Sequence, residues 1–256
     1  MPESELIKLC AYDTSSITPE IIGKFNYNVG MKDEYGRTAL MWLCRNNKYI
    51  TPEIIRKLKN EIGMRDNDGE TALMYLCQYN KNITPEIIRE FKEPSKGTFE
   101  KSLLEEGLAK TVHEIRILQN LKDEIRIQNK YGKTALMKLC EKNKNITPEL
   151  IRELKDEIGM GTNWRGTALM HLCENNENIT PQLIRELKDE IRMKDDDGMT
   201  ALMYLCKSNS SITPELIREL KIELKIQNKC RTTALMCLCE YNKSITPELI
   251  RELKSS

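Results

Sequence analysis

The chain has 256 residues, and its 40 lysines and arginines are balanced by 39 aspartates and glutamates, which leaves a formal net charge of +1. No overall positive field therefore favours nucleic acid or an anionic membrane surface, and no apolar run reaches the roughly 18 residues that a membrane-spanning helix needs. The only histidines are His113 and His171, so we expect no histidine-based catalysis, no metal site and no cofactor.

The N-terminal residues MPESELIKLC lack a basic start followed by an apolar stretch, so they show no secretory signal. We therefore expect a cytoplasmic protein that acts without a membrane.

Two short motifs recur along the chain in phase with each other. The motif T-A-L-M is repeated in steps of 33 residues with one step of 63, beginning at Thr38, Thr71, Thr134, Thr167, Thr200 and Thr233. The motif I-T-P-E, or once I-T-P-Q, keeps the same steps, beginning at Ile17, Ile50, Ile83, Ile146, Ile179, Ile212 and Ile245. A fixed period of this size is typical of a solenoid, in which each unit packs only on its neighbours. The sequence therefore predicts one all-α solenoid over residues 1–256.

The spacing predicts about eight units of about 33 residues: an N-terminal cap at 1–30, then 31–63, 64–95, 96–126, 127–159, 160–192, 193–225 and a C-terminal unit at 226–256. The unit at 96–126 is degenerate. It fills the step of 63 with apolar residues such as Leu103, Leu104 and Ile117 at the expected positions, but it lacks I-T-P. It would bend the stack, carry a specific contact, or have drifted without a function.

Each unit is predicted to contain a turn, a short helix, a loop and a second helix, as residues 33–62 illustrate. The turn residues 33–36 end in Gly36, which tolerates a positive φ angle. Thr38 is a suitable N-cap for a first helix ALMWLCRN, and Thr51 followed by Pro52 is suited to open the second helix. The repeated second-helix pattern, as in 149–158, predicts a solvated outer face on which Arg152 and Asp156 form an i,i+4 pair.

The pattern Asp-x-x-Gly-x-Thr followed by leucine resembles the ankyrin repeat, whose signature is T-P-L-H-x-A. Asp33, Gly36, Thr38 and Leu40 match it, and the units at 64–95 and 193–225 repeat the match. The unit at 127–159 matches with Asn129 in place of the aspartate. The T-A-L-M variant is similar to ankyrin arrays that are expanded in some protists. The resemblance implies L-shaped units, a hairpin-like finger from each turn, a concave face lined by fingers and first helices, and a non-catalytic role in protein–protein binding.

Six of the nine cysteines occupy one repeat position, namely Cys44, Cys77, Cys140, Cys173, Cys206 and Cys239. Because the resemblance implies about 10 Å between equivalent positions and a disulfide needs Cα atoms within about 7 Å, we expect small buried side chains rather than disulfides. Cys237 and Cys239 form C-x-C without a second cysteine pair, so zinc is not expected. Free thiols in this number favour a reducing compartment.

Information about a partner lies at positions that differ between otherwise similar units. The residue that directly follows T-A-L-M, which is the fifth when the threonine is counted as the first, varies between units. It is expected to face the concave surface or to pack on the neighbouring first helix. Turn tips and the ends of first helices vary as well, and Lys130, Lys133, Lys138 and Lys142 indicate a basic middle between acidic stretches, unless these are ordinary solvated tips. The candidate partner-binding residues are Tyr35, Trp42, Arg45, Tyr75, Tyr79, Lys130, Tyr131, Lys133, Lys138, Lys142, Trp164, His171, Asp196, Asp197, Tyr204 and Tyr241.

No phosphate-binding glycine loop, G-x-S-x-G or H-E-x-x-H motif occurs, so no catalytic residues are proposed from the sequence. The favoured function is a scaffold that binds another protein through its concave face, as a monomer. The alternative is a structural or self-assembling element that associates through uncapped repeat ends, because the last unit keeps its apolar residues without a polar replacement.

Overall fold

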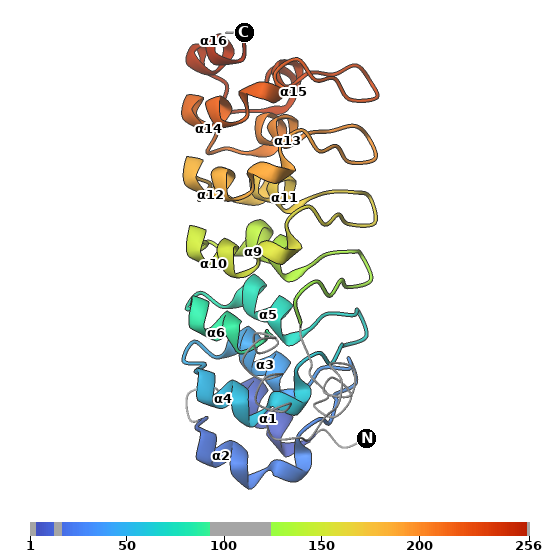
Figure 1. The fold of residues 1–256 in the computed structure, drawn as a ribbon, viewed down its shortest axis with the longest axis vertical. Coiled ribbons are helices and arrows are strands. Elements are labelled where there is room, and N and C mark those ends of the chain that lie inside the picture. The colour runs from blue at the N-terminus through green and yellow to red at the C-terminus, as the bar shows by residue number, and fades with distance from the viewer. Residues whose placement is uncertain (1–3, 13–16, 93–123, 255–256) are drawn as a thin grey trace, which may run out of the picture.

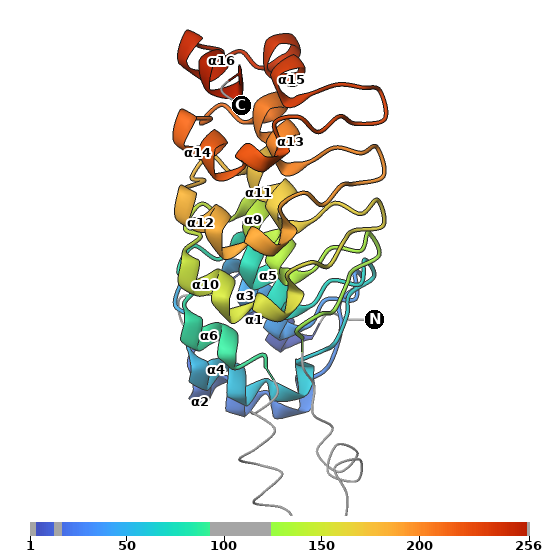
Figure 2. The ribbon, with the colours of Figure 1, turned by 45° about the horizontal axis from the view of Figure 1, so that its top comes forward.

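The computed structural model describes residues 4–12, 17–92 and 124–254. These residues form an elongated stack of helix pairs without a strand, with the first helices in a middle column and the second helices beside them (Figures 1 and 2). The first helices are α1 (Glu5–Tyr12), α3 (Ala39–Asn46), α5 (Ala72–Tyr79), α9 (Ala135–Lys142), α11 (Ala168–Asn175), α13 (Ala201–Ser208) and α15 (Ala234–Tyr241). The second helices are α2 (Pro19–Lys24), α4 (Pro52–Lys57), α6 (Pro85–Arg89), α10 (Pro148–Glu153), α12 (Pro181–Glu186), α14 (Pro214–Glu219) and α16 (Pro247–Lys254). The prediction of an all-α solenoid is confirmed.

The helix boundaries follow from the capping residues of each unit. The Thr38 hydroxyl accepts a hydrogen bond from the Met41 N–H, and α3 covers the eight predicted residues. Thr51 caps α4 in the same way, and Pro52 occupies its first position. Most second helices then tighten into a 3₁₀ turn: Asn26–Asn28, Lys59–Glu61, Lys155–Glu157, Lys188–Glu190 and Lys221–Glu223.

In five of the seven described units, one glutamate is buried beneath the start of the first helix. The Glu157 carboxylate accepts hydrogen bonds from the backbone N–H groups of Arg126 (2.9 Å) and Leu136 (2.7 Å). Leu136 lies in the first turn of α9, where the helix dipole favours a negative charge, and Arg126 ends the preceding unit. The carboxylate therefore joins two units. Equivalent pairs of bonds are made by Glu61, Glu124, Glu190 and Glu223.

A row of buried asparagines forms a second connection between units, at the residue that follows each first helix. The Asn143 side-chain N–H₂ donates to the carbonyl oxygens of Cys77 (2.9 Å) and Asn80 (3.0 Å) in the neighbouring unit. Its side-chain oxygen accepts from the Asn145 N–H at 2.9 Å. Asn80, Asn176, Asn209 and Asn242 make the same three types of bond. These bonds fix the register between consecutive first helices.

Asn47 is the natural control for this row, because its buried side-chain N–H₂ has no hydrogen-bond partner among the described residues. We expect Asn143→Ala to lower the free energy of unfolding by about 2–4 kcal/mol, since two carbonyls and one N–H lose a buried partner. Asn47→Ala removes only the bond from the Tyr49 N–H and should cost about 1 kcal/mol or less. Urea unfolding followed by circular dichroism checks the difference. Equal losses in the two variants would show that the bonds between units contribute nothing.

The prediction that residues 96–126 form a unit of the stack between α5–α6 and α9–α10 is wrong. Helix α9 packs directly on α5, and Asn143 bonds to Asn80 without an intervening unit. Glu124 completes the α5–α6 unit, because it accepts the Leu73 N–H at 2.6 Å and donates its own N–H to Phe91 at 3.1 Å. Residues 93–123, which include most of the predicted unit, lie outside the described residues. Seven helix pairs, rather than eight, are stacked in the described part of the chain.

The outer face is formed by ion pairs between consecutive second helices. The predicted Arg152–Asp156 pair is wrong, because α10 ends at Glu153 and Asp156 lies in the 3₁₀ turn that follows. Arg152 pairs instead with Glu149 at 3.3 Å and with Glu186 of α12 at 2.5 Å. Equivalent contacts between units join Arg56 to Glu90, Arg89 to Glu153, Arg185 to Glu219 and Arg218 to Glu252. These arginines are exposed, so each pair contributes at most about 1 kcal/mol.

The cysteines at the common repeat position behave as predicted in every unit but the last. Cys44, Cys77, Cys140, Cys173 and Cys206 are fully buried, whereas Cys239 is exposed on α15, the last first helix described. Met236 is likewise 53% exposed, although its counterparts in the preceding units are at most 3% exposed. The final unit therefore presents the face that every earlier unit covers with its neighbour.

This arrangement predicts two classes of thiol among the nine free cysteines. Burial raises the pKa of Cys10, Cys237 and the five cysteines at the common position, so these thiols carry little thiolate and are shielded from reagents. Cys230 and Cys239 are exposed. We expect these two thiols to react rapidly with an aromatic disulfide reagent at pH 8 and the others only on unfolding. Rapid labelling that persists in Cys230→Ser/Cys239→Ser would contradict this division.

The tight turn of each unit requires a left-handed residue at one position. Glycine supplies it at Gly36, Gly69, Gly132 and Gly198, whereas Arg165 and Arg231 adopt φ angles of 63° and 61° at the equivalent position. A Cβ on Gly132 would lie 2.6 Å from the Asn163 nitrogen, so glycine is also needed there for space.

We therefore expect opposite results at the same position of two units. Arg165→Gly should raise the free energy of unfolding by about 0.5–1 kcal/mol, because the strain of the left-handed arginine exceeds the entropic cost of glycine. Gly132→Ala should lower it by about 2 kcal/mol or more, through both strain and collision. Thermal unfolding measures both, at about 2–4 °C for each kcal/mol in a chain of this size. A destabilised Arg165→Gly variant would exclude strain at this turn.

Candidate functional site

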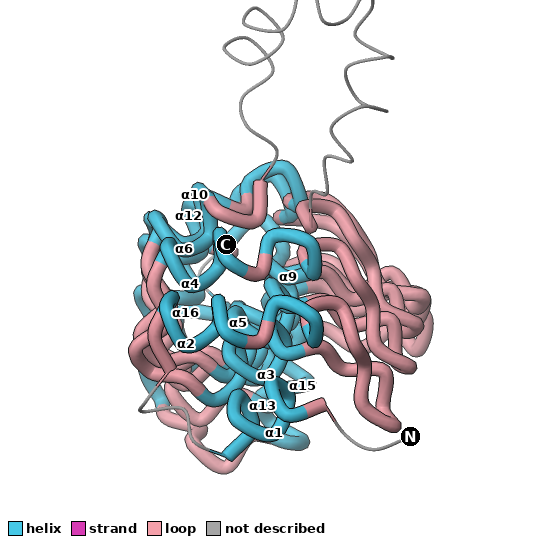
Figure 3. Tube along the Cα trace, turned by 90° about the horizontal axis from the view of Figure 1, so that it is seen from below, coloured by secondary structure: helices cyan, strands magenta, loops and turns pink. Residues whose placement is uncertain are grey.

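The turn tips project together from one side of the first helices (Figures 1 and 3). Backbone hydrogen bonds join consecutive tips, for example from the Asn67 N–H to the Tyr35 carbonyl at 3.0 Å and from the Lys130 N–H to the Asp68 carbonyl at 3.0 Å. We call the surface made by these tips, the fifth T-A-L-M residues and the last residues of the first helices the finger face. The candidate residues from the sequence all belong to it.

In three units an aspartate of the turn holds the fifth residue of T-A-L-M beside the tip. Asp33 accepts a hydrogen bond from the Trp42 indole N–H at 3.0 Å. Asp66 accepts one from the Tyr75 hydroxyl at 2.7 Å, and Asp195 accepts one from the Tyr204 hydroxyl at 2.6 Å. The other oxygen of each aspartate accepts two backbone N–H groups of its own turn. The aromatic side chain and the turn therefore form one rigid group.

Where the fifth residue is not aromatic, the turn aspartate is also missing, as in the α9–α10 unit. There Asn129 replaces the aspartate, and Lys138 finds a carboxylate in the neighbouring unit. The Lys138 ammonium lies 2.5 Å from Glu70, and the Asn129 amide donates to the same oxygen at 2.9 Å. Both side chains of the ion pair are almost buried, with exposed fractions of 10% and 11%.

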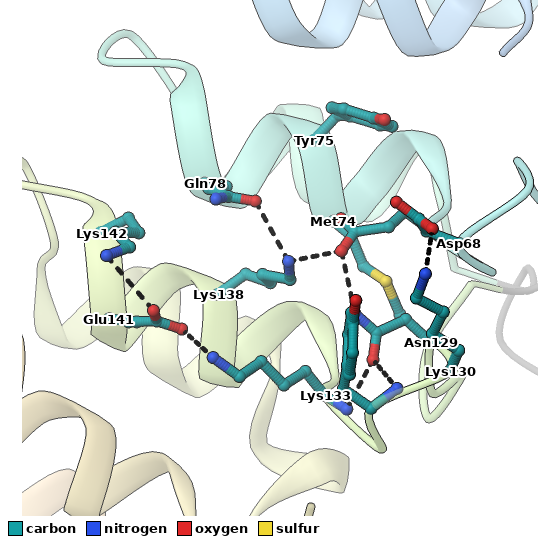
Figure 4. A network of polar contacts seen from close by, with 12 residues as sticks. Asp68, Met74, Tyr75, Gln78, Asn129, Lys130, Lys133, Lys138, Glu141 and Lys142 are labelled. Carbon is teal, nitrogen blue, oxygen red and sulfur yellow. Dashed lines mark hydrogen bonds and ion pairs between the residues drawn. The ribbon is translucent and has the colours of Figure 1, made fainter. Parts of the chain in front are cut away.

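The expected basic middle of this face is wrong, because each of its lysines is neutralised (Figure 4). Lys130 pairs with Asp68 at 2.5 Å, and Lys133 and Lys142 both pair with Glu141, at 2.5 and 3.3 Å. Burial favours a raised pKa for Glu141, but the bond from Lys133 outweighs it and holds that pKa below its ordinary range. The central units therefore present paired charges rather than a positive field.

His171 occupies the fifth position of the next unit, and its Nε2 atom is buried without a hydrogen-bond partner. Burial, followed by the positive charge of Lys133, lowers the pKa of His171 to about 4. The imidazole is therefore neutral at physiological pH, and its Nε2 atom is buried although the residue as a whole is half-buried.

Exposure divides the candidate residues into two groups. Tyr75 and Lys138 are buried, Cys237 at the same position is also buried, and Trp42, Arg45, Lys133, His171 and Tyr204 are half-buried. The exposed candidates are Tyr35, Tyr79, Lys130, Tyr131, Lys142, Trp164, Asp196, Asp197 and Tyr241. Contacts with the turn and with the neighbouring unit therefore explain why side chains at the fifth position are buried or half-buried. The turn tips and the ends of the first helices are the accessible part of the finger face.

Sequence reasoning missed several residues that shape this face, notably Arg37, Asp66 and Glu70. Arg37 lies between the Tyr35 and Trp42 rings, and its Nε atom donates to the Tyr75 hydroxyl at 3.1 Å. A signal was present for the aspartates: aspartate stands nine residues before Trp42, Tyr75 and Tyr204, but asparagine or threonine stands nine residues before Lys138, His171 and Cys237. This covariation within one chain indicates a side-chain contact.

The described residues contain neither a cluster of metal-binding side chains nor a membrane-spanning helix. No group of three or more His, Cys, Asp or Glu side chains in the described ranges is placed to hold a metal ion. Within the same ranges, no helix combines the length and apolar character needed to cross a bilayer.

Comparison with known proteins identifies this type of stack. The family model for ankyrin repeats (three copies) matches residues 6–95. The ankyrin repeat domain of Bcl-3, a member of the IkappaB family, superposes with a TM-score of 0.60 at 17% identity, covering 99% of both chains. A chain of the complex between the Bd0816 predatory endopeptidase of Bdellovibrio bacteriovorus and the immunity protein Bd3460 gives a TM-score of 0.51 at 17% identity, covering 87% of this chain and 100% of that one. A search of curated proteins finds no match.

At this level of identity the two solved structures establish the fold alone. The family match, however, falls on units whose turn, first helix and second helix recur in the same register through the described part of the chain. The resemblance inferred from the T-A-L-M units is therefore confirmed: residues 6–95 match the ankyrin repeat family, and the described part of the chain has the fold of an ankyrin repeat domain.

Proposed function

We propose that this protein is a non-catalytic interaction module that binds another protein through its finger face, which the ankyrin resemblance implies is concave. The supporting observation is the gathering of exposed aromatic side chains on this one face. Tyr35, Tyr79, Tyr131, Trp164 and Tyr241 are between 43% and 63% exposed. Large amphipathic rings are favoured contact residues in protein interfaces, and they lose little conformational entropy on binding.

The rigid backing of the face supports the same proposal. The turns are tied to one another and to the first helices by hydrogen bonds, so a partner would meet a surface that is already ordered. The paired charges of the central units suit a protein better than nucleic acid or an anionic membrane, which would require an excess of unpaired cations. Free thiols and balanced charge support a cytoplasmic location.

The test compares two sets of substitutions on opposite faces. Tyr79→Ala/Tyr131→Ala/Trp164→Ala alters exposed rings of the finger face, and Arg152→Gln/Arg185→Gln alters the outer face equally far along the stack. Purified variants are checked by circular dichroism and used to capture proteins from a cell extract for mass spectrometry. We expect the finger-face variant to lose proteins that the wild-type chain and the outer-face variant both retain.

Unchanged capture by a folded finger-face variant would contradict the proposal. A loss confined to the outer-face variant would move the site to the second helices.

The exposed end of the stack favours a second candidate function, self-association. Met236 and Ile245 occupy positions that are buried in every preceding unit, yet they are 53% and 40% exposed. An apolar repeat end of this kind normally requires a cap. Sedimentation velocity over a wide concentration range tests it: association that Met236→Glu abolishes would support an end contact, and a monomer throughout would eliminate it.

A further inference from the structure

Arginine and aromatic side chains alternate across the finger face of the two units that contain α3 and α5. The Arg37 guanidinium carbon lies 4.8 Å from the centre of the Tyr35 ring and 5.0 Å from that of Trp42. The Arg45 guanidinium carbon lies 5.5 Å from the same indole and 4.9 Å from the Tyr79 ring. We call Tyr35, Arg37, Trp42, Arg45 and Tyr79 the arginine–aromatic stack.

Hydrogen bonds to residues of the turns fix the side chains of the arginine–aromatic stack. Tyr79 stacks on Tyr75 with ring centres 6.0 Å apart, and the Tyr75 hydroxyl bonds to both Arg37 and Asp66. Trp42 is fixed by Asp33. Both guanidinium groups are thus positioned before any partner arrives, which lowers the entropic cost of binding.

Among the residues that the structure describes, neither Arg37 nor Arg45 forms an ion pair with a carboxylate. This distinguishes them from the four candidate lysines of the same face, each of which has a carboxylate partner. It also distinguishes them from the arginines of the outer face, such as Arg152 and Arg185, which pair with glutamates. The Asp33 and Asp66 carboxylates act on Arg37 from nearby without forming an ion pair with it, and the Arg45 guanidinium lies against the Trp42 and Tyr79 rings.

A guanidinium that stacks on an aromatic ring can still donate from N–H groups at its edge, and two such groups match the two oxygens of a carboxylate. In Arg37 the Nε–H is already bonded to Tyr75, so its terminal N–H₂ groups would make this contact. Tyr35 and Tyr79 flank the two arginines and are exposed, so they could contact apolar groups next to that carboxylate. At the other end of the face, Asp196 and Asp197 are exposed and unpaired in the described part of the chain, so an acidic segment would be repelled there. The charge pattern therefore favours a bound segment whose acidic part lies over the two arginines and away from Asp196 and Asp197.

We propose that the arginine–aromatic stack binds aspartate or glutamate side chains of a partner protein segment, with its acidic part over the α3 and α5 units. This inference rests on the proposed function, since it names the chemistry that the finger face would select.

The experiment selects ligands from a random dodecapeptide library displayed on phage. The baits are the wild-type chain, Arg37→Gln/Arg45→Gln, and the outer-face control Arg152→Gln/Arg185→Gln, each confirmed to be folded by circular dichroism. We expect acidic peptides from the wild-type chain and the control but not from the stack variant. For one selected peptide, fluorescence polarisation should show a Kd about 10-fold or more weaker for Arg45→Gln. Arg45→Lys, which keeps the charge but not the planar fork, should be intermediate.

The outcomes separate this inference from the function on which it rests. Peptides that lack acidic residues, but whose binding is lost in Tyr131→Ala/Trp164→Ala, would overturn the acidic preference and leave the finger face as the binding surface. Acidic peptides that bind the stack variant as tightly as the wild-type chain would also overturn the role of the two arginines. Peptides whose binding only the outer-face control loses would overturn both proposals.

Discussion

Replacing Glu157 by alanine is expected to lower the free energy of unfolding by about 3–5 kcal/mol. The carboxylate is fully buried, and it accepts the N–H groups of Arg126 and Leu136, which belong to two different units. Its loss leaves the buried Leu136 N–H and the part-buried Arg126 N–H without this partner and creates a cavity at the junction. The second variant, Glu157→Gln, should cost less than alanine, because the amide oxygen still accepts one N–H while its N–H₂ group faces the other.

Glu149→Ala is the matched control, since Glu149 is an exposed glutamate of the same unit that forms an ion pair with the exposed Arg152. Its expected cost is about 1 kcal/mol or less. Urea unfolding followed by circular dichroism measures all three variants. If Glu157→Ala proves no worse than Glu149→Ala, the buried glutamates do not hold the units together.

The burial of Glu157 could not be predicted from the sequence. The unit plan could be predicted because capping threonines, prolines and apolar residues recur in register, and each acts within its own unit. Glu61, Glu157, Glu190 and Glu223 recur just as regularly, but a glutamate followed by an apolar residue looks like part of a solvated helix tail. Only the 3₁₀ turn that follows most second helices rotates it inward, and that turn depends on packing against the next unit.

The misplaced unit at 96–126 has a similar cause. The end of the predicted unit does resemble the other units, since Glu124 and Ile125 match Glu157 and Ile158. Apolar spacing, however, cannot tell which helix stacks on which, and a solenoid can continue in register between units that are far apart in the chain. The hydrogen bond from the Leu73 N–H to Glu124 joins two residues that are far apart in the chain, and it helps to keep α5 and α9 in register.

Charge on the finger face could not be predicted for a related reason. Lys130, Lys133, Lys138 and Lys142 were counted as one positive group because they lie on one unit. Their partners include Asp68 and Glu70, which lie on the preceding unit of the stack. Sequence alone identifies which positions vary, but the neighbour across the stack decides whether a variable charge is free or neutralised.

The ion pair between Lys138 and Glu70 gives the second large effect. We expect Glu70→Ala to lower the free energy of unfolding by about 3–5 kcal/mol, because Lys138 would stay almost buried and, within the described ranges, would keep the Gln78 oxygen at 3.3 Å as its partner. Lys138→Met should be costly for the reciprocal reason. The double variant Glu70→Leu/Lys138→Met should recover most of the loss, since apolar groups of similar size require no ionic partner.

A double-mutant cycle by urea unfolding isolates this coupling. The control cycle uses Lys130→Met and Asp68→Leu, whose ion pair joins the same two units at the same distance but lies in solvent. We expect a coupling of less than about 1 kcal/mol there and several times more for the buried pair. Since the two pairs differ mainly in burial, equal couplings would mean that desolvation does not strengthen the contact. Lys138 would then be a surface charge, available to a partner as the sequence first indicated.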